Sequence, residues 1–304
     1  MALSFSGQVK NEICKARLFC RDCGQALLYG MLLFCRGISV DEVLFNTESK
    51  AAADVFTQLL VDWTGSIVTI SEPDLRNRTS RPIYSVTIDD QSDREKLVSR
   101  FFPLWPSDRN GIAPEFLQKE CCKTAFLRGA YLSCGTMVNP EKEYHLEFLI
   151  YKESLCQEFQ LFLQDFDLDF RRTERTKGYS LYIKESEQIE DTLARLGAIK
   201  ASMELMNLKI EKELRNQANR ITNCETANIE KTVSASMEQI HKITKLRESS
   251  VFQTLPPPLM EAAELRLAHP EMSLRELCEL EGGKLSRSGL NHRLQKLCEW
   301  ADKL

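Results

Sequence analysis

Residues 286–297 read SRSGLNHRLQKL, and this segment has the spacing of a short helix with one apolar stripe. The stripe continues to the end of the expected helix and consists of Leu290, Leu294, Leu297 and Ala301. Intervals of four, three and four residues place these side chains on one helix face. At 3.6 residues per turn, the polar and basic side chains then lie on the opposite face. Residues 284–296 contain no acid, so this second face is polar and basic.

A second short helix is expected immediately before this one, from Ser273 to Leu280. Ser273 and Glu276 form a capping-box pattern, in which the two side chains satisfy the first backbone N–H groups of a helix. Gly282 and Gly283 follow and favour a tight turn. A short helix, a tight turn and a basic helix form the arrangement that places side chains in a DNA major groove. The alternative is a plain three-helix bundle with a solvated polar face, and the stretch without acids favours DNA binding.

The predicted partner is double-stranded DNA, because the basic helix carries the residue types that read bases and clamp phosphates. Gln and Asn can bind adenine with two hydrogen bonds, Arg reads guanine, and Lys and Ser hold phosphates. The candidate DNA-binding residues are Lys284, Arg287, Ser288, Asn291, His292, Arg293, Gln295 and Lys296. One recognition helix does not reveal the target sequence.

The chain has 304 residues, which suits two domains joined by a connector. Its net charge of −4 argues against a general nucleic-acid coat but permits a site-specific binder with local basic patches. The longest apolar run is too short to cross a bilayer, and no export signal is apparent. We therefore expect a cytoplasmic, nucleoid-associated protein with no membrane partner and no small-molecule substrate.

Residues 1–200 show the same order of elements twice, which indicates an internal duplication. In the first pass, helices are expected at 21–34, 48–63 and 93–101, and strands at 38–45, 67–70 and 83–88. In the second pass, helices are expected at 121–134, 152–166 and 185–196, and strands at 144–150, 168–172 and 179–183. This pattern predicts an α+β domain of antiparallel sheets with helices packed on one face.

Each pass includes a basic loop between its last two strands. The residues of these loops that are candidates for DNA contact are Arg76, Arg78, Arg81, Arg171, Arg172, Arg175 and Lys177. If both loops lie at the free face of the sheets, they can approach DNA. Ordinary solvated turns are an equally good interpretation, since exposed charged turns are common.

The strand signals end near residue 201, where the composition becomes helical. One helix is expected over 203–221, and the capping-box pattern from Thr222 to Glu225 predicts that a new helix begins there. Pro256–Pro258 is expected to separate it from a helix over 259–268, and the two short helices described above complete the chain. The predicted domains are therefore an α+β domain over 1–200, a helical linker over 201–222 and an all-α helix-turn-helix domain over 223–304.

The whole chain resembles the WhiA family of bacterial transcription regulators. The matching segments are 5–6, 121–122, 126–132, 144–147 and 177–179 in the first domain, and 223–228, 255–256, 274–277, 282–284 and 286–297 in the second. The resemblance implies a degenerate LAGLIDADG homing-endonuclease fold followed by a domain like region 4 of sigma factors. It also implies a role in sporulation in some bacteria and in cell division or chromosome segregation in others. RNA polymerase or another regulator is a candidate partner.

The resemblance also locates the positions at which a LAGLIDADG nuclease carries its catalytic acids. Alignment with the motif places Cys134 at the acidic position of the second copy and Arg36 at that of the first. Metal-assisted cleavage of DNA needs carboxylates there, because hard cations prefer oxygen ligands. A scaffold that has lost catalysis is expected, with its two motif helices meeting through Gly30, Gly129 and Ala130.

Four of the eleven cysteines form two pairs, Cys20/Cys23 and Cys121/Cys122. The duplication places both pairs at equivalent starts of the two motif helices, where four thiolates could bind zinc or a cluster. Adjacent cysteines are awkward ligands, however, and a second CxxC is missing. Buried apolar thiols are favoured, and no metal or cofactor is expected.

Three functions remain in competition. The first is a sequence-specific transcription regulator, and the second is an active metal-dependent endonuclease, which the missing acids disfavour. The third is a nucleoid-associated scaffold that binds a protein partner and for which DNA binding is secondary.

Overall fold

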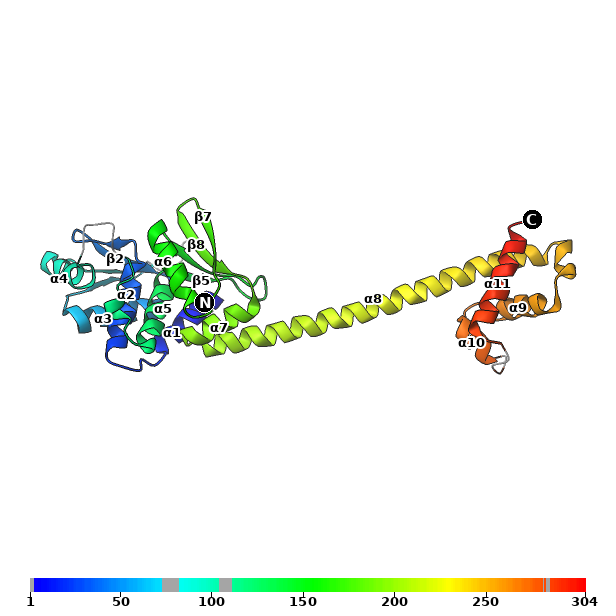
Figure 1. Cartoon of the computed structure of the whole chain (residues 1–304), viewed down its shortest axis with the longest axis horizontal. Helices are drawn as coiled ribbons and strands as arrows, with labels where there is room; N and C mark the ends of the chain where they lie inside the picture. Colours follow the sequence, from blue (N-terminus) through cyan, green and yellow to red (C-terminus); the bar gives the residue numbers. More distant parts are fainter. Residues whose placement is uncertain (1–2, 73–81, 104–110, 281, 283–284) are drawn as a thin grey trace. The chain divides into compact units, whose positions relative to one another are not determined.

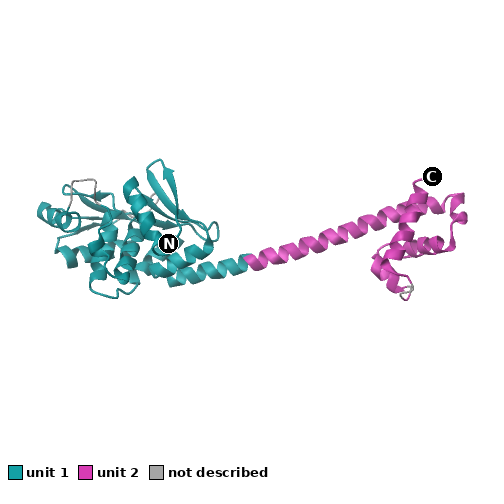
Figure 2. Cartoon of the chain, viewed as in Figure 1, with its two compact units in different colours: residues 1–212 teal, residues 213–304 magenta. Residues whose placement is uncertain are grey.

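The computed structural model describes residues 3–72, 82–103, 111–280, 282 and 285–304 (Figure 1). The expected DNA-contacting residues Arg76, Arg78, Arg81 and Lys284 lie outside this part of the chain. Two compact units are present, Met1–Lys212 and Glu213–Leu304, coloured separately in Figure 2. Within the described residues, no helix is both long and apolar enough to cross a membrane.

The first unit contains the predicted duplication. After α1 (Phe5–Lys15), its first copy consists of α2 (Asp22–Leu33), β1 (Gly37–Ile38), β2 (Val43–Thr47), α3 (Lys50–Thr64), β3 (Thr69–Ser71), β4 (Tyr84–Thr87) and α4 (Gln91–Phe101). The second copy consists of α5 (Glu120–Cys134), β5 (Gly135–Met137), β6 (Leu146–Ile150), α6 (Glu153–Gln164), β7 (Arg171–Arg175), β8 (Gly178–Ile183) and α7 (Ser186–Leu196). The two antiparallel sheets have the equivalent strand orders β1-β2-β4-β3 and β5-β6-β8-β7. The α+β prediction is thus confirmed.

Helices α2 and α5 pack closely against each other and join the two copies. A Cβ atom added at Gly30 would collide with the carbonyl of Phe126, and one at Gly129 would collide with the carbonyl of Leu27. Ala130 is fully buried in the same contact. Only glycine lets two helix backbones approach this closely, so the predicted role of these small residues is confirmed.

Local signals set the boundaries of α3. Ser49 caps α3 by accepting a hydrogen bond from the backbone N–H of Ala52, and Gly65 ends that helix with a φ of 66°. Residues 38–45, expected as one strand, instead form the hairpin β1–β2. The Ser39 hydroxyl accepts hydrogen bonds from the N–H groups of Asp41 and Glu42, which folds the chain back on itself.

The expected new helix at Thr222 is wrong, because α8 runs without interruption from Ile199 to Arg247. No glycine or proline occurs within this range, and most of its residues favour helix. A capping-box pattern starts a helix only where the preceding backbone is not already helical. The segment 201–222 is therefore not a separate element, and α8 continues from the first unit into the second.

The second unit is a small helical domain built from the end of α8, α9 (Pro257–Ala268), α10 (Leu274–Leu280) and α11 (Arg287–Ala301). Its core is separate from that of the first unit, and it is formed by Ile243, Leu246, Leu255, Leu259, Ala262, Ala263, Leu277, Leu290, Leu294, Leu297 and Ala301. All four residues of the predicted apolar stripe are thus buried, which confirms the helical phase of residues 286–297.

Candidate nucleic-acid interface

Helix α10 begins with the capping box that the sequence predicts. The N–H of Ser273 donates to the Glu276 carboxylate at 2.7 Å, and the N–H of Glu276 donates to the Ser273 hydroxyl at 3.3 Å. These bonds hold the pKa of Glu276 below its usual value. Gly282 has a φ of 65° and donates its N–H to the carbonyl of Glu279, which forms the turn after α10.

Helix α11 presents a polar surface opposite its buried stripe. Ser288, His292 and Gln295 are exposed at the helical spacing that puts them on one face. Arg287 and Lys296 flank them and are also exposed, whereas Asn291 is half-buried. The Ser286 hydroxyl caps the helix by accepting from the N–H of Gly289, and no acid lies in the first turn. The positive end of the helix dipole is therefore open to an anion.

Arg293 differs from the other candidate residues because it is half-buried and contacts the protein itself. Its Nη1 atom donates to the carbonyl of Pro258 at 3.4 Å, which joins α11 to the start of α9. This bond uses one of five N–H donors, so the guanidinium keeps the capacity for a phosphate. Its first role in the free protein is to fix the angle between two helices.

A buried arginine connects several elements of this domain by hydrogen bonds. Arg266 of α9 is only 2% exposed, and its Nη1 donates to the carbonyl of Met272 at 2.6 Å and to the Ser236 hydroxyl at 3.3 Å. Ser236 of α8 donates in turn to the carbonyl of Pro270. Burial lowers the pKa of Arg266. These bonds connect α8, α9 and the turn before α10, and thereby fix the platform on which α11 lies.

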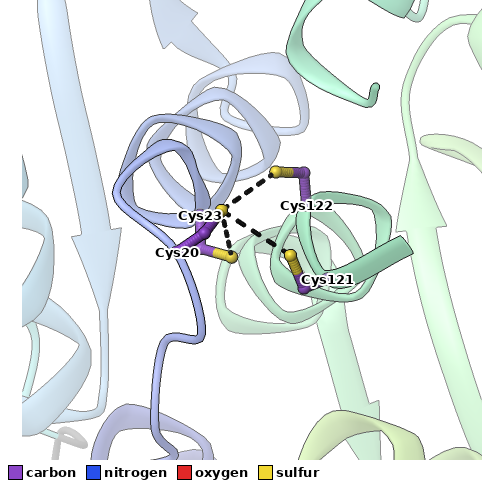
Figure 3. A group of neighbouring side chains, drawn as sticks. All are labelled: Cys20, Cys23, Cys121 and Cys122. Atoms are coloured by element: carbon purple, nitrogen blue, oxygen red, sulfur yellow. Dashed lines mark hydrogen bonds between the residues drawn. The ribbon is translucent and has the colours of Figure 1, made fainter. Parts of the chain in front are cut away.

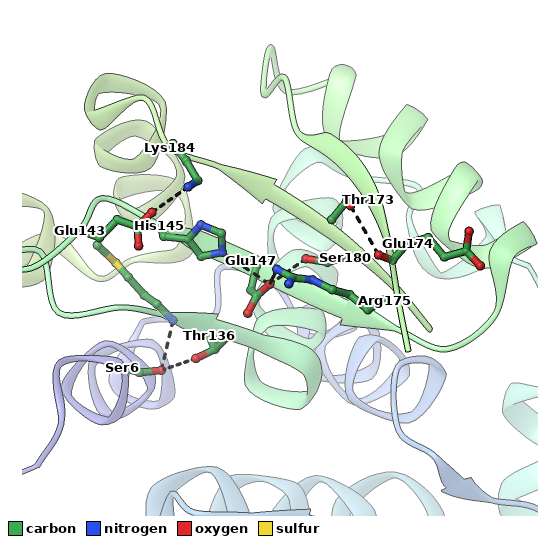
Figure 4. Close-up of polar contacts among 11 residues, drawn as sticks. Ser6, Thr136, Glu143, His145, Glu147, Thr173, Glu174, Arg175, Ser180 and Lys184 are labelled. Atoms are coloured by element: carbon green, nitrogen blue, oxygen red, sulfur yellow. Dashed lines mark hydrogen bonds and ion pairs between the residues drawn. The ribbon is translucent and has the colours of Figure 1, made fainter. Parts of the chain in front are cut away.

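The open face of the second sheet carries a different polar cluster (Figure 4). Strand register places Arg171, Thr173 and Arg175 of β7 on the same face as Ser180 and Tyr182 of β8. The expected basic loop over 171–178 is thus mostly a strand, with only the turn at its tip. Arg172 points to the other face, where its Nη1 lies 3.5 Å from the carboxylate of Glu153 in α6. The expectation that Arg171, Arg172 and Arg175 form one basic loop is therefore wrong, because alternation along a strand separates them.

Glu147 lies at the centre of this open face. Its carboxylate accepts a hydrogen bond from Ser180 at 2.7 Å and lies 3.5 Å from both Arg175 and His145. The His145 ring stacks on Tyr182 with centroids 5.5 Å apart. The basic side chains here are thus partly neutralised within the sheet. Alternation of polar and apolar residues in 145–148 is the signal that could have identified Glu147 from the sequence.

The two positions aligned with nuclease acids are equivalent in the structure. Arg36 and Cys134 each precede the glycine that begins the first strand of its copy, Gly37 or Gly135. The Arg36 guanidinium lies over the ring of Tyr151, 3.0 Å from the centroid. Burial raises the pKa of the Cys134 thiol, against the opposite effect of the Lys10 ammonium.

The two aligned positions therefore offer a basic and a neutral group where nuclease chemistry needs carboxylates. Lys10 of α1 extends over the same end and donates to the carbonyl of Leu132 at 3.1 Å. Among the described residues, the one group of three or more His, Cys, Asp or Glu side chains placed to share a metal lies elsewhere, at four cysteines. Sequence reasoning missed Lys10 and Tyr151, because both come from segments distant in the sequence.

Two known domain families match this chain. Residues 218–301 match the family described as the WhiA C-terminal HTH domain, and residues 123–215 match the WhiA LAGLIDADG-like domain. The protein therefore belongs to the class that joins a LAGLIDADG-like domain to a helix-turn-helix domain.

Full-length relatives specify the family. The "Probable cell division protein WhiA" of Ruminiclostridium cellulolyticum is 36% identical over 99% of this chain and 98% of that protein. The protein of the same name from Caldicellulosiruptor saccharolyticus is 34% identical, over 99% and 96% respectively. The crystal structure of full-length DUF199/WhiA from Thermatoga maritima has a TM-score of 0.60 and 25% identity, and it covers 99% of each chain. This chain belongs to the WhiA family.

Proposed function

We propose that this chain is a sequence-specific DNA-binding transcription regulator. The observation that carries the proposal is the exposed face of α11, where Ser288, His292 and Gln295 lie between basic flanks and above a buried stripe. In a helix-turn-helix domain such a helix enters the major groove, with its first turns against the bases. Gln295 and His292 supply base contacts in this arrangement, and Arg287 and Lys296 supply phosphate contacts.

The regulated process is cell division, with the related steps of chromosome segregation and, in a spore-forming host, sporulation. The relatives are named probable cell division proteins, which supports this assignment. A nucleoid location in the cytoplasm and contact with RNA polymerase or another regulator belong to the same proposal. Both follow from action at promoters.

The LAGLIDADG-like domain acts in this proposal as a scaffold that does not cut DNA. Arg36 and the neutral thiol of Cys134 occupy the positions of metal-binding acids, and neither can hold Mg²⁺. The open sheet face keeps exposed Arg171 and Arg175 for weak contact with DNA. Their pairing with Glu185 and Glu147 limits this contribution, since each already has a counter-charge at 3.0 and 3.5 Å respectively.

A nucleoid-associated scaffold that binds a protein partner is a second candidate, and one observation favours it. The middle of α8 exposes apolar side chains, with Leu214 62% and Ile229 63% accessible. Exposed apolar residues on a polar helix are typical of a surface that a partner covers. In this alternative, DNA binding is secondary and chromosomal occupancy depends on the partner.

Selection of duplexes from a random library with the full-length protein tests the proposal. Fluorescence anisotropy then compares the selected duplex with a scrambled one, using Gln295→Ala and a matched control, Gln217→Ala, which removes an exposed glutamine from α8. The proposal predicts an enriched motif whose affinity falls only in Gln295→Ala. Without enrichment, and with steep dependence on salt alone, the scaffold alternative replaces it.

A further inference from the structure

The structure brings both cysteine pairs together at the start of the two motif helices (Figure 3). The ligand atoms of Cys20, Cys23, Cys121 and Cys122 all lie within 4.8 Å of one another. The Cys20 sulfur is 3.4 Å from that of Cys23, 3.6 Å from that of Cys121 and 3.7 Å from that of Cys122. Two of these residues are buried and two are half-buried, so the group lies just below the surface.

The N-terminal ends of two helices and a lysine border this group. Cys23 lies in the first turn of α2, and Cys121 and Cys122 lie in the first turn of α5, so two positive helix ends converge on the sulfur atoms. Lys119 forms an ion pair with Asp22 at 2.8 Å, which links the two helix starts. This lysine also acts electrostatically on the sulfurs of Cys20 and Cys122.

A second basic residue fixes the loop that carries Cys20. Arg128 of α5 is 7% exposed and donates to the carbonyl of Arg17 at 3.0 Å, which ties this loop to the helix. Its guanidinium acts electrostatically on Cys23. A buried cation needs a nearby negative charge, and a cluster of thiolates supplies one.

The spacing of the sulfur atoms fits a tetrahedral zinc ion. A tetrahedral zinc ion has Zn–S bonds of about 2.3 Å, which places its sulfurs about 3.8 Å apart. The three separations from the Cys20 sulfur, 3.4, 3.6 and 3.7 Å, are close to this value, and all six lie within 4.8 Å. A four-iron cluster attaches each thiolate to a different iron and needs sulfurs farther apart. A disulfide has sulfurs about 2.05 Å apart and would involve only one pair.

We propose that Cys20, Cys23, Cys121 and Cys122 bind one Zn²⁺ ion as four thiolates. This proposal replaces the expectation that these residues are buried apolar thiols without a metal. Binding forms four Zn–S bonds and releases the four thiol protons to solvent, which leaves a complex of charge −2 beside Lys119 and Arg128. Adjacent Cys121 and Cys122 can both serve because Cys20, on a loop, lies within reach of each.

The proposed site is structural. Four protein ligands fill the tetrahedron and leave no open position for a substrate. The ion would connect the loop before α2 to the start of α5, and so join the two copies at the N-terminal ends of their motif helices. Arg36 and Cys134 follow the opposite, C-terminal ends. The zinc site is thus distinct from the lost nuclease centre.

Metal analysis of the full-length wild-type protein tests the proposal. Protein purified under reducing conditions without chelators is expected to contain about one zinc per chain by mass spectrometry, a stoichiometry set by four ligands. Replacing zinc with Co²⁺ should produce the intense visible absorption of a tetrahedral site and a near-ultraviolet thiolate-to-cobalt band. Zinc removal should lower the thermal unfolding midpoint.

Cysteine variants provide the matched comparison. Cys23→Ser and Cys122→Ser should lose at least about nine-tenths of the bound zinc, whereas Cys156→Ser, which removes a buried cysteine outside the group, should retain it. The wild-type cobalt spectrum decides the question even if the cluster variants do not fold. A metal-free wild-type protein that gives no cobalt–thiolate band would overturn the proposal, as would bound iron or an isolated Cys20–Cys23 disulfide.

Discussion

Replacing Gly129 with alanine should destabilise the first unit by forcing α2 and α5 apart. The added Cβ would lie 2.9 Å from the backbone nitrogen of Met31 and closer still to the carbonyl of Leu27. Both obstacles are backbone atoms, which cannot rotate away as a side chain can. Overpacking of this kind costs about 1–3 kcal/mol, and the strain here is at the upper end of that range because the whole helix must move.

The intrinsic preference of alanine for helix offsets about 1 kcal/mol of this cost. The net loss should therefore be about 1–2 kcal/mol. Gly24→Ala is the matched control, since it lies on α2 and its Cβ would meet only the side chains of Trp63 and Leu59. These side chains can adjust, so the control should keep or gain stability.

Urea unfolding followed by circular dichroism measures both variants against the wild type. We expect a lower midpoint urea concentration for Gly129→Ala. The slope of the unfolding free energy against urea concentration should not change, because the surface exposed on unfolding is the same. If Gly129→Ala unfolds at the same urea concentration as Gly24→Ala, the two motif helices are not in backbone contact. The close packing of α2 against α5 described above would then be incorrect.

Three further predictions concern the functional surfaces. Lys296→Ala should reduce the slope of log affinity against log salt by about 0.9 and weaken binding to all duplexes alike, whereas Gln295→Ala should cost about 1–3 kcal/mol on the selected duplex alone. Equal loss on scrambled DNA would contradict the assignment of Gln295 to base contact. Supercoiled plasmid incubated with the protein and Mg²⁺ should stay intact on a gel, and nicking that chelation abolishes would refute the loss of catalysis. In metal-free reduced protein, the hydrogen bond between the sulfurs of Cys20 and Cys23 is the main cause that lowers the pKa of Cys20 to about 7. The alkylation rate of Cys20 should therefore rise with pH to a midpoint near 7, since the reactive thiolate forms above the pKa. Bound zinc should suppress this alkylation. A midpoint near that of an ordinary thiol would contradict the lowered pKa of Cys20.

Local sequence signals predicted the elements of the helix-turn-helix domain because each has a short-range cause. The stripe from Leu290 to Ala301 is set by helical periodicity, and the caps at Ser273 and Ser286 satisfy backbone groups within four residues. Periodicity and capping need no knowledge of distant contacts.

The sequence was a poorer guide where a signal depends on its surroundings. The capping-box pattern at Thr222 has no effect inside α8, because a helix already surrounds it. Arg171 and Arg172 could be separated only once their strand and its register were known. The bond between Arg293 and the carbonyl of Pro258 depends on how α9 and α11 cross, which neither segment encodes alone.

The arrangement of the cysteine pairs could be predicted only in part. The duplication placed them at equivalent helix starts, but their separation depends on the approach of α2 and α5 at Gly30 and Gly129. Counting cysteines therefore favoured isolated thiols, and the geometry instead supports a metal site.

A sequence reader differs from a general DNA binder in the ratio of two dissociation constants, for the duplex enriched by selection and for its scrambled counterpart. This ratio should be measured by anisotropy with full-length protein at physiological salt. We expect a ratio of at least about 10³, which His292→Ala combined with Gln295→Ala reduces toward one. A wild-type ratio near one would contradict the claim that the exposed face of α11 reads DNA sequence.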